Sequence, residues 1–292
     1  MQNMTAAILH LKKLIHRKSS GTFGTSIALL AAVLVNTGCQ TVQTTQPGVV
    51  GVERKQTMTS LLPVSQVNDG AEKAYQQVLA DARKKNQLNR DAAQLARVKR
   101  IADRLIPVTS AFRNDAPGWK WEVNVITSDE VNAWCMPGGK IAVYTGLIDK
   151  LKITDDEMAA VMGHEIAHAL REHGRERASH AALQGTVLNI GAALLGIGSA
   201  GVDISSLILD VTFNLPNSRQ DETEADRIGV ELSARGGFDP HAAVGLWQKM
   251  SQLGGAKGPQ FLSTHPSPDN RIKDLQVYSD RVMPLYQAAP KK

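Results

Sequence analysis

The sequence predicts an α+β protein that is predominantly helical, with a small mixed or antiparallel sheet packed against one central helix. Three patterns lead to this fold class. Apolar residues recur at helical spacing from residue 69 to Pro107, they alternate as in strands over 119–144, and a second helical pattern begins at residue 155. The chain has 292 residues, 42% of them hydrophobic, which suffices for a sizeable core.

The first 38 residues have the pattern of a bacterial export signal. An apolar stretch over 26–35 is too short to span a bilayer comfortably, and it leads to Gly38 and Cys39. Four cations and no acid precede it: Lys12, Lys13, Arg17 and Lys18. A small residue directly before a Cys at this place resembles a lipobox. We therefore expect residues 1–38 to be a lipoprotein signal peptide and Cys39 to be lipidated.

Asn36 departs from this pattern, because a Leu-like residue is usual three places before the Cys. An ordinary secretory signal with a different cleavage site is therefore the alternative. By resemblance to bacterial sorting rules, Gln40 rather than Asp after Cys39 points to the outer membrane. We expect the protein to be lipid-anchored there, on the periplasmic face.

The basic excess of the chain comes almost wholly from this leader. The formal net charge is +5, and without the four leader cations 29 basic and 28 acidic residues remain. No basic stripe with interleaved aromatic residues occurs elsewhere, which argues against nucleic-acid binding. If Cys39 is acylated, Cys135 is the one cysteine left, so no internal disulfide can form. Cys135 lies in a strand-like run and is expected to be a small buried residue.

Residues 39–68 look like a flexible tether that leads to a folded body over 69–288. The tether is rich in Thr, Gln, Val and Ser, contains Pro47 and Pro63, and shows no helical period. The folded body is expected to begin with two packing helices. Strands are expected over 119–126, 131–136 and 140–144, with a tight turn at 137–139. Three acids at 155–157 suit the first turn of the helix that follows.

Residues 185–213 are apolar, rich in Gly and Ala, and interrupted by Asp203. This stretch is too broken for a transmembrane span. We expect a buried or membrane-leaning helical hairpin that roofs the active site, and ordinary core helices are the alternative. Further helices are expected from about residue 220 to 236, from 238 to 250 and from 269 onward.

The helix that follows the strands carries the motif HExxH at 164–168. Residues four apart share one helix face, so His164 and His168 can bind one ion while Glu165 handles a proton. Two neutral His and a later carboxylate form a set that zinc favours in catalytic sites, with one position left for water. A zinc-dependent peptidase with one Zn²⁺ per chain is the leading hypothesis. A chance pattern on a charged helix is the alternative.

The third ligand does not follow from HExxH alone. Glu222 and Asp226 have the same four-residue spacing on their own helix. Glu222 could bind the ion while Asp226 accepts a hydrogen bond from a ligating His and fixes its orientation. Asp221 and Glu224 compete for the ligand role. The alternative is an ordinary acidic first turn that the helix dipole favours.

The chain resembles the gluzincin peptidases that include HtpX and the CAAX prenyl proteases (metallopeptidase family forty-eight), most closely their periplasmic lipoprotein members. The resembling motifs lie in order between about residues 70 and 288: Asn132-Ala133 with Pro137-Gly138-Gly139, Gly163-HEIAH-Ala169, Glu222-Thr223-Glu224-Ala225-Asp226, and His265-Pro266 followed by Arg271. The resemblance implies Glu222 rather than Glu224 as the ligand. It also implies zinc endopeptidase activity and a largely helical gluzincin fold with a small sheet. The chain lacks the several membrane spans of the polytopic members.

On this basis we expect a zinc metallopeptidase domain over 69–288 with Glu165 as general base. A second donor to the developing oxyanion is needed, and His265 or Arg271 could provide it or cap the site in a resting state. Tyr144 is a weaker candidate, and a structural loop His is the alternative for His265. The strand through Asn132, Ala133 and Trp134 could bind substrate backbone as an added strand.

A tethered endopeptidase that reads extended backbone suits the degradation of misfolded envelope proteins. Unfolded or misfolded envelope proteins are then the expected substrates, and the outer-membrane assembly machinery is an expected partner. The rival is a zinc-containing chaperone-like assembly factor with latent or no proteolysis. Glu165 argues against it, because a purely structural zinc site needs no base. A third interpretation is a protease held latent by His265 and the apolar hairpin.

Overall fold

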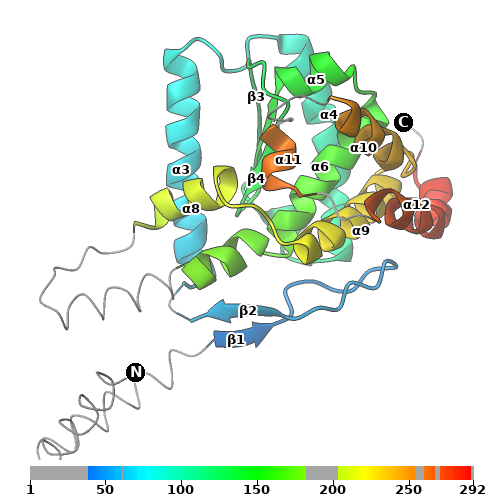
Figure 1. Cartoon of the computed structure of the whole chain (residues 1–292), viewed down its shortest axis with the longest axis horizontal. Coiled ribbons are helices and arrows are strands. Elements are labelled where there is room, and N and C mark those ends of the chain that lie inside the picture. Colours follow the sequence, from blue (N-terminus) through cyan, green and yellow to red (C-terminus); the bar gives the residue numbers. More distant parts are fainter. Residues whose placement is uncertain (1–38, 61, 182–202, 254–259, 267–269, 291–292) are drawn as a thin grey trace, which may run out of the picture. The chain divides into compact units, whose positions relative to one another are not determined.

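The structure is a computed structural model that describes residues 39–60, 62–181, 203–253, 260–266 and 270–290 (Figure 1). The expected signal peptide over 1–38 lies outside the described residues. Gln40–Lys292 forms one compact unit. Within the described ranges, no helix is long and apolar enough to cross a membrane.

The N-terminal segment, residues 40–60, is part of the folded body. It carries β1 (Cys39–Val42) and β2 (Gln56–Thr59), which pair in a two-stranded sheet. Val50, Val52 and Met58 are buried, and the Val50 amide donates to Glu231 at 3.0 Å. The prediction of a flexible tether is therefore wrong for these residues. The apolar side chains scattered among Thr and Gln have partners in the later helices, and composition alone did not reveal them.

Two helices follow, as the apolar periodicity predicts. They are α3 (Val64–Lys84), which begins earlier than expected, and α4 (Ala92–Val108). The Asp91 side chain caps α4 by accepting hydrogen bonds from the backbone amides of Ala93 and Gln94. Two short 3₁₀ turns, η1 (Thr109–Ala111) and η2 (Ala116–Gly118), lead into the sheet.

The three-stranded sheet is mixed, and it is small, as predicted. Its strands are β3 (Glu122–Ile126), β4 (Ala133–Met136) and β5 (Lys140–Tyr144), in the order β3-β5-β4. β3 is parallel to β5, and β4 is antiparallel to it, so β4 is an edge strand. In the turn between β4 and β5, Gly139 has φ +86°, and a Cβ there would meet Trp121 at 2.6 Å.

The central helix α6 (Asp155–Leu170) follows the short helix α5 (Thr145–Leu151). Thr154 and Glu157 form a capping box at its start. α6 packs along β4 on one side and along α9 (Arg219–Arg235) on the other. The two helices cross at Gly163 and Gly229, where a Cβ on Gly163 would lie 2.8 Å from the Gly229 carbonyl oxygen. This close crossing brings residues of α9 next to HExxH.

A further helix follows α6 and is described over residues 173–181. The described helices after it are α8 (Ile204–Phe213), α10 (Ala242–Gln252), α11 (Gln260–Thr264) and α12 (Arg271–Ala288), besides α9. Figure 1 shows α8 crossing α3, and α8 also packs on β4. α8 is the described part of the expected hairpin over 185–213. Residues 182–202 lie outside the described residues, so the hairpin itself stays a prediction.

Candidate metal centre and active-site cleft

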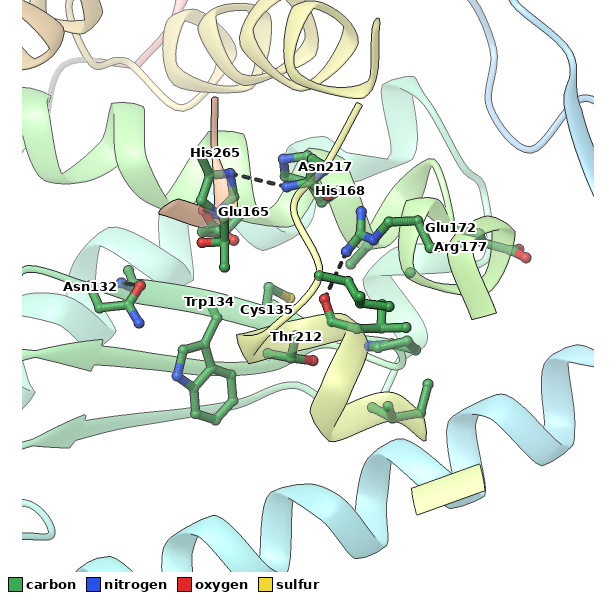
Figure 2. A pocket seen from close by; sticks show the side chains of 18 residues that line it. Asn132, Trp134, Cys135, Glu165, His168, Glu172, Arg177, Thr212, Asn217 and His265 are labelled. Atoms are coloured by element: carbon green, nitrogen blue, oxygen red, sulfur yellow. Dashed lines mark hydrogen bonds and ion pairs between the residues drawn. The ribbon is translucent and has the colours of Figure 1, made fainter. Parts of the chain in front are cut away.

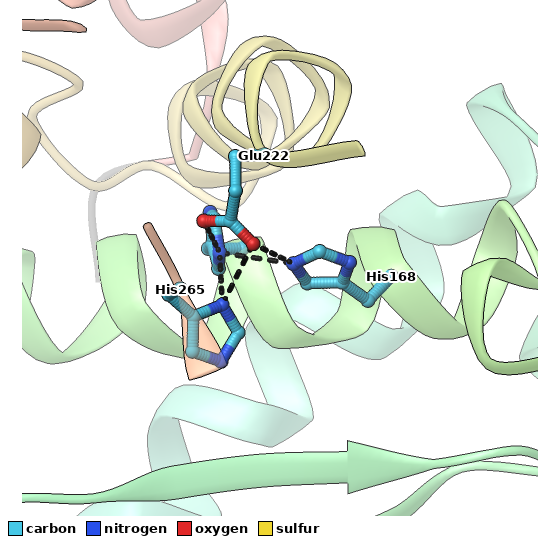
Figure 3. A group of neighbouring side chains, drawn as sticks. His168, Glu222 and His265 are labelled. Atoms are coloured by element: carbon cyan, nitrogen blue, oxygen red, sulfur yellow. Dashed lines mark hydrogen bonds and ion pairs between the residues drawn. The ribbon is translucent and has the colours of Figure 1, made fainter. Parts of the chain in front are cut away.

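Four side chains meet in a buried cluster between α6, α9 and the end of α11 (Figure 3). His164 and His168 come from α6, Glu222 comes from α9, and His265 directly follows α11. His164 Nε2 lies 3.1 Å from His168 Nε2 and 3.4 Å from Glu222 Oε2. His265 Nδ1 lies 3.2 Å from His164 Nε2 and 3.0 Å from Glu222 Oε1. The structure thus joins His265 to the three expected ligands.

This donor set fits a zinc ion. Zinc bonds of about 2.0–2.1 Å in a tetrahedron place the ligand atoms about 3.4 Å apart, close to the spacing in the cluster. Glu222 Oε2 and Glu165 Oε1 are buried and accept no hydrogen bond from the described residues. The Arg271 guanidinium lies 3.2 Å from Glu222 Oε2, and a metal ion would add a further cationic partner for these buried carboxylates. Burial lowers the pKa of His164, but Glu222 and Asp226 raise it to about 9, so the site attracts positive charge.

His164 is oriented by Asp226. With His164 Nε2 in the cluster, its Nδ1 lies 2.9 Å from Asp226 Oδ1, and the same oxygen accepts a hydrogen bond from Arg271 at 2.7 Å. The Arg271 guanidinium lies 3.1 Å from the centre of the Trp247 ring. Asp226 therefore stands behind the ligand, in the place proposed for it from the sequence. Arg271, proposed as an oxyanion donor or a cap, contacts Asp226 instead and does not line the cleft.

His168 is oriented by a second histidine that the sequence did not single out. Its Nδ1 lies 2.8 Å from His173 Nδ1, and His173 Nε2 lies 3.1 Å from Glu224 Oε2. Glu224 is turned away from the cluster and also accepts hydrogen bonds from Arg171 and Arg54. Burial alone would raise the pKa of Glu224, but the hydrogen bonds from His173 and Arg54 lower it to about 2. Glu224 is therefore an anion that fixes His173, and not a ligand in the cluster.

Arg54 connects this network to the N-terminal segment. Besides Glu224, its guanidinium binds Glu176 at 2.9 Å and Asp221 at 2.7 Å. Asp221 and Glu224 are both on α9, on either side of the ligand Glu222. The N-terminal segment therefore contacts the residues that hold the metal site.

Glu165 lies in the position of a general base. Its carboxylate is buried, and Oε1 is 3.5 Å from His265 Nε2. Burial raises the pKa of Glu165 above its usual range, while His265 and His164 oppose this effect. A raised pKa brings a carboxylate closer to the pH at which it both accepts and releases a proton.

A cleft opens beside Glu165 and His168, between β4 and α8 (Figure 2). Its lining includes Asn132, Ala133 and Trp134, the three residues expected at the substrate strand. The wall also holds Cys135, which is half-buried rather than buried as expected. Tyr144, the weaker candidate for an oxyanion donor, is absent from the lining of this cleft and lines a different hollow.

The edge of β4 offers few free backbone groups. The Tyr144 amide donates to the Asn132 carbonyl at 3.0 Å, and the antiparallel register then turns the backbone groups of Ala133 and Cys135 outward. One end of this edge is closed, because the Phe261 amide donates to the Val131 carbonyl at 3.2 Å. The outward Ala133 amide donates to the Asn132 side chain at 2.9 Å.

Residues 92–279 match the family model described as Peptidase family M48. The chain belongs to this family. Membership places it among the zinc metallopeptidases, and the cluster of His164, His168, Glu222 and His265 could hold the metal ion. The resemblance to metallopeptidase family forty-eight, inferred from the four sequence motifs, is therefore confirmed.

Several relatives carry the same domain in longer chains. The chain is 35% identical over 183 residues to "Mitochondrial metalloendopeptidase OMA1" of Schizosaccharomyces pombe, covering 62% of this chain and 52% of that protein. It is 34% identical over 210 residues to "Metalloendopeptidase OMA1, mitochondrial" of Homo sapiens, covering 67% of this chain and 38% of that protein. It is 29% identical over 174 residues to "Beta-barrel assembly-enhancing protease" of Escherichia coli (strain K12), covering 55% of this chain and 35% of that protein. The matches thus span about half of these relatives or less.

Proposed function

We propose that this protein is a zinc-dependent endopeptidase of the bacterial cell envelope that hydrolyses extended or misfolded proteins. The observation that carries the proposal is Glu165, a buried carboxylate with an oxygen that accepts no hydrogen bond from the described residues, beside four candidate metal donors and at the wall of a cleft. A structural zinc site needs neither a base nor a cleft. The chaperone-like alternative explains neither feature.

The chain's own residues supply positioning and proton transfer. Zinc, when bound, supplies the Lewis acidity that acidifies water and polarises the scissile carbonyl. Glu165 accepts the proton of the attacking water and passes it to the leaving amine. His265 Nε2 faces Glu165 and can donate to the oxyanion once its Nδ1 leaves the donor cluster. Asp226 and His173 keep the two HExxH imidazoles in the orientation that binds the metal.

The edge of β4 supports recognition of extended backbone. A peptide that adds to this edge can pair with the outward carbonyls of Ala133 and Cys135 and passes Glu165. Main-chain pairing of this kind makes little demand on side chains, which suits misfolded substrates.

The cellular setting is a proposal that rests on the N-terminal sequence. The lipobox-like residues before Cys39 support a lipid anchor at the outer membrane, facing the periplasm. The name of the Escherichia coli relative supports a role close to outer-membrane assembly. Replacing Cys39 with Ser should abolish labelling by an alkyne-tagged fatty acid and release the protein from the membrane fraction. Labelling that persists in Cys39→Ser would refute the anchor.

The activity is tested with Glu165→Gln, in which the amide cannot take the water proton. The variant should retain zinc while casein cleavage falls by at least about 10³-fold. The control is Asp149→Asn, at an exposed acid on α5, which should cleave like the wild type. Equal cleavage by Glu165→Gln and wild type rules out the mechanism. A wild type that holds unfolded casein without cleaving it favours the chaperone-like alternative.

A latent protease is a second candidate, favoured by the position of His265. Four protein donors fill a tetrahedral zinc site, whereas catalytic sites keep one position for water. Asn217 Nδ2 lies 3.2 Å from the same His265 Nδ1 and can donate to it when that nitrogen does not hold the ion. If His265 holds the enzyme latent, His265→Ala cleaves casein faster than the wild type. Slower cleavage by His265→Ala assigns His265 to catalysis instead.

A further inference from the structure

The active-site cleft contains a cation that the proposed mechanism does not use. Arg177 lines the cleft together with Glu165 and His168, and it is the one Arg or Lys among the described lining residues. In Figure 2 its guanidinium lies on the side of the pocket where His168 and Asn217 also lie. Its Nη2 donates to the Val211 carbonyl in the last turn of α8 at 3.1 Å.

Most of the Arg177 guanidinium has no partner. Its Nε and Nη1 are shielded from solvent and make no hydrogen bond to any described residue. Burial lowers the pKa of Arg177, and the acids that oppose this effect act at a distance, with Asp221 first among them. A buried guanidinium that holds only one neutral carbonyl is unfavourable, because burial removes its hydration and no anion replaces it.

Three carboxylates near the cleft are already taken by other arginines, and no ion pair joins Arg177 to Glu165, which lines the same cleft. Glu172 binds Arg113 at 2.6 Å and Arg175 at 2.8 Å. Glu176 and Glu224 bind Arg54. The segments outside the described residues contain a single acid, Asp269. The described residues thus leave Arg177 without a carboxylate, although every arginine just named has one.

We propose that Arg177 binds a carboxylate of the substrate and makes the cleft selective for peptides that carry one near the scissile bond. This proposal rests on the endopeptidase function proposed above. A guanidinium prefers a carboxylate over neutral acceptors because its charged donors match the two oxygens. The substrate carboxylate is either an Asp or Glu side chain or the free C-terminus, and both offer the same chemistry to Arg177.

The test measures a selectivity ratio within each enzyme. Fluorogenic peptides are made in matched pairs, Glu against Gln at each position around the scissile bond, and a free against an amidated C-terminus. The ratio of kcat/KM for the acidic over the neutral member should be at least about tenfold for the wild type at one position. The pair that shows it identifies the source of the carboxylate. Arg177→Met should bring that ratio to about one, chiefly through KM.

The neighbouring Arg175 provides the matched control. Its side chain binds Glu172 and the Leu62 carbonyl, so Arg175→Met should keep the wild-type ratio. Arg177→Lys keeps the charge and should retain part of the selectivity ratio. This variant also tests the proposal if Arg177→Met fails to fold. A wild-type ratio of about one for every pair overturns the proposal, as does an unchanged ratio in Arg177→Met. Casein cleavage that depends on Glu165 establishes separately whether the endopeptidase function holds.

Discussion

His164 and His168 lie one helical turn apart on α6, yet different parts of the chain orient them. Asp226 and Arg271 hold His164, and both lie within the region that matches the family model. His173 and Glu224 hold His168, and Glu224 is bound by Arg54, which precedes that region. One ligand is thus supported inside the family domain, and the other depends in part on the N-terminal segment.

The difference lies in the kind of group behind each ligand. An anion accepts the Nδ1 proton of His164, which makes that imidazole a stronger ligand. A neutral imidazole stands behind His168 and passes the hydrogen bond on to Glu224. We therefore expect zinc binding to depend most on Asp226, less on His173 and least on Arg54.

The largest effect is expected for Asp226→Ala. The change removes the acceptor of the His164 Nδ1 proton and leaves Arg271 buried with less compensation, so zinc affinity should fall by about 100-fold. Competition with a chromophoric chelator measures the affinity. Asp274→Ala is the control, because Asp274 pairs with Arg227 and not with the cluster, and it should bind zinc like the wild type. A loss below about threefold in Asp226→Ala would contradict the expected order.

A smaller effect is expected for His173→Phe. The phenyl ring fills a similar volume but accepts no hydrogen bond from His168, so zinc affinity should fall by about tenfold. His173→Gln retains an acceptor and should recover most of the affinity in the same chelator assay. Equal losses in the two variants would show that His173 acts through packing alone.

The smallest effect on zinc is expected for Arg54→Ala, which cuts the N-terminal segment from α9. Affinity should fall by no more than about threefold, while the free energy of unfolding falls by about 2 kcal/mol, between the values for exposed and for buried ion pairs. Urea denaturation measures the free energy of unfolding. Arg97→Ala, which removes a pair with the exposed Asp155, should cost less than about 1 kcal/mol. A tenfold loss of zinc affinity in Arg54→Ala would reverse the order.

The sequence predicted the features of the site that depend on residue spacing within a single helix or strand. The four-residue interval on each helix places His164 with His168 and Glu222 with Asp226, and alternation identifies the strands beside them. Glu222 was chosen over Glu224 by family resemblance, since both lie on α9 and spacing could not separate them. The structure agrees, because Glu224 is directed toward His173, Arg171 and Arg54.

Contacts between distant segments of the chain have no fixed residue spacing, so the sequence could not predict them. Arg54 and Glu224 are 170 residues apart, and nothing in a Thr- and Gln-rich stretch announces an ion pair with a later helix. His265 belongs to the site through a chain crossing that a single sequence does not encode as a pattern. His173 lies only five residues after His168, but that interval is not a helical spacing and did not single it out. Arg177 is similar, because a cation without a partner is visible only once the partners of its neighbours are known.

The closed end of β4 sets how much of a substrate must be disordered. Phe261 occupies the Val131 carbonyl, and the edge ends at the turn after Met136. An added peptide therefore finds outward groups at only two strand positions, Ala133 and Cys135, and pairs over roughly 7–10 Å of extended chain. A frayed terminus or a single exposed loop satisfies this requirement. With the proposed docking to β4, a protein that has lost only one local element would be within reach of the enzyme, well before it unfolds as a whole.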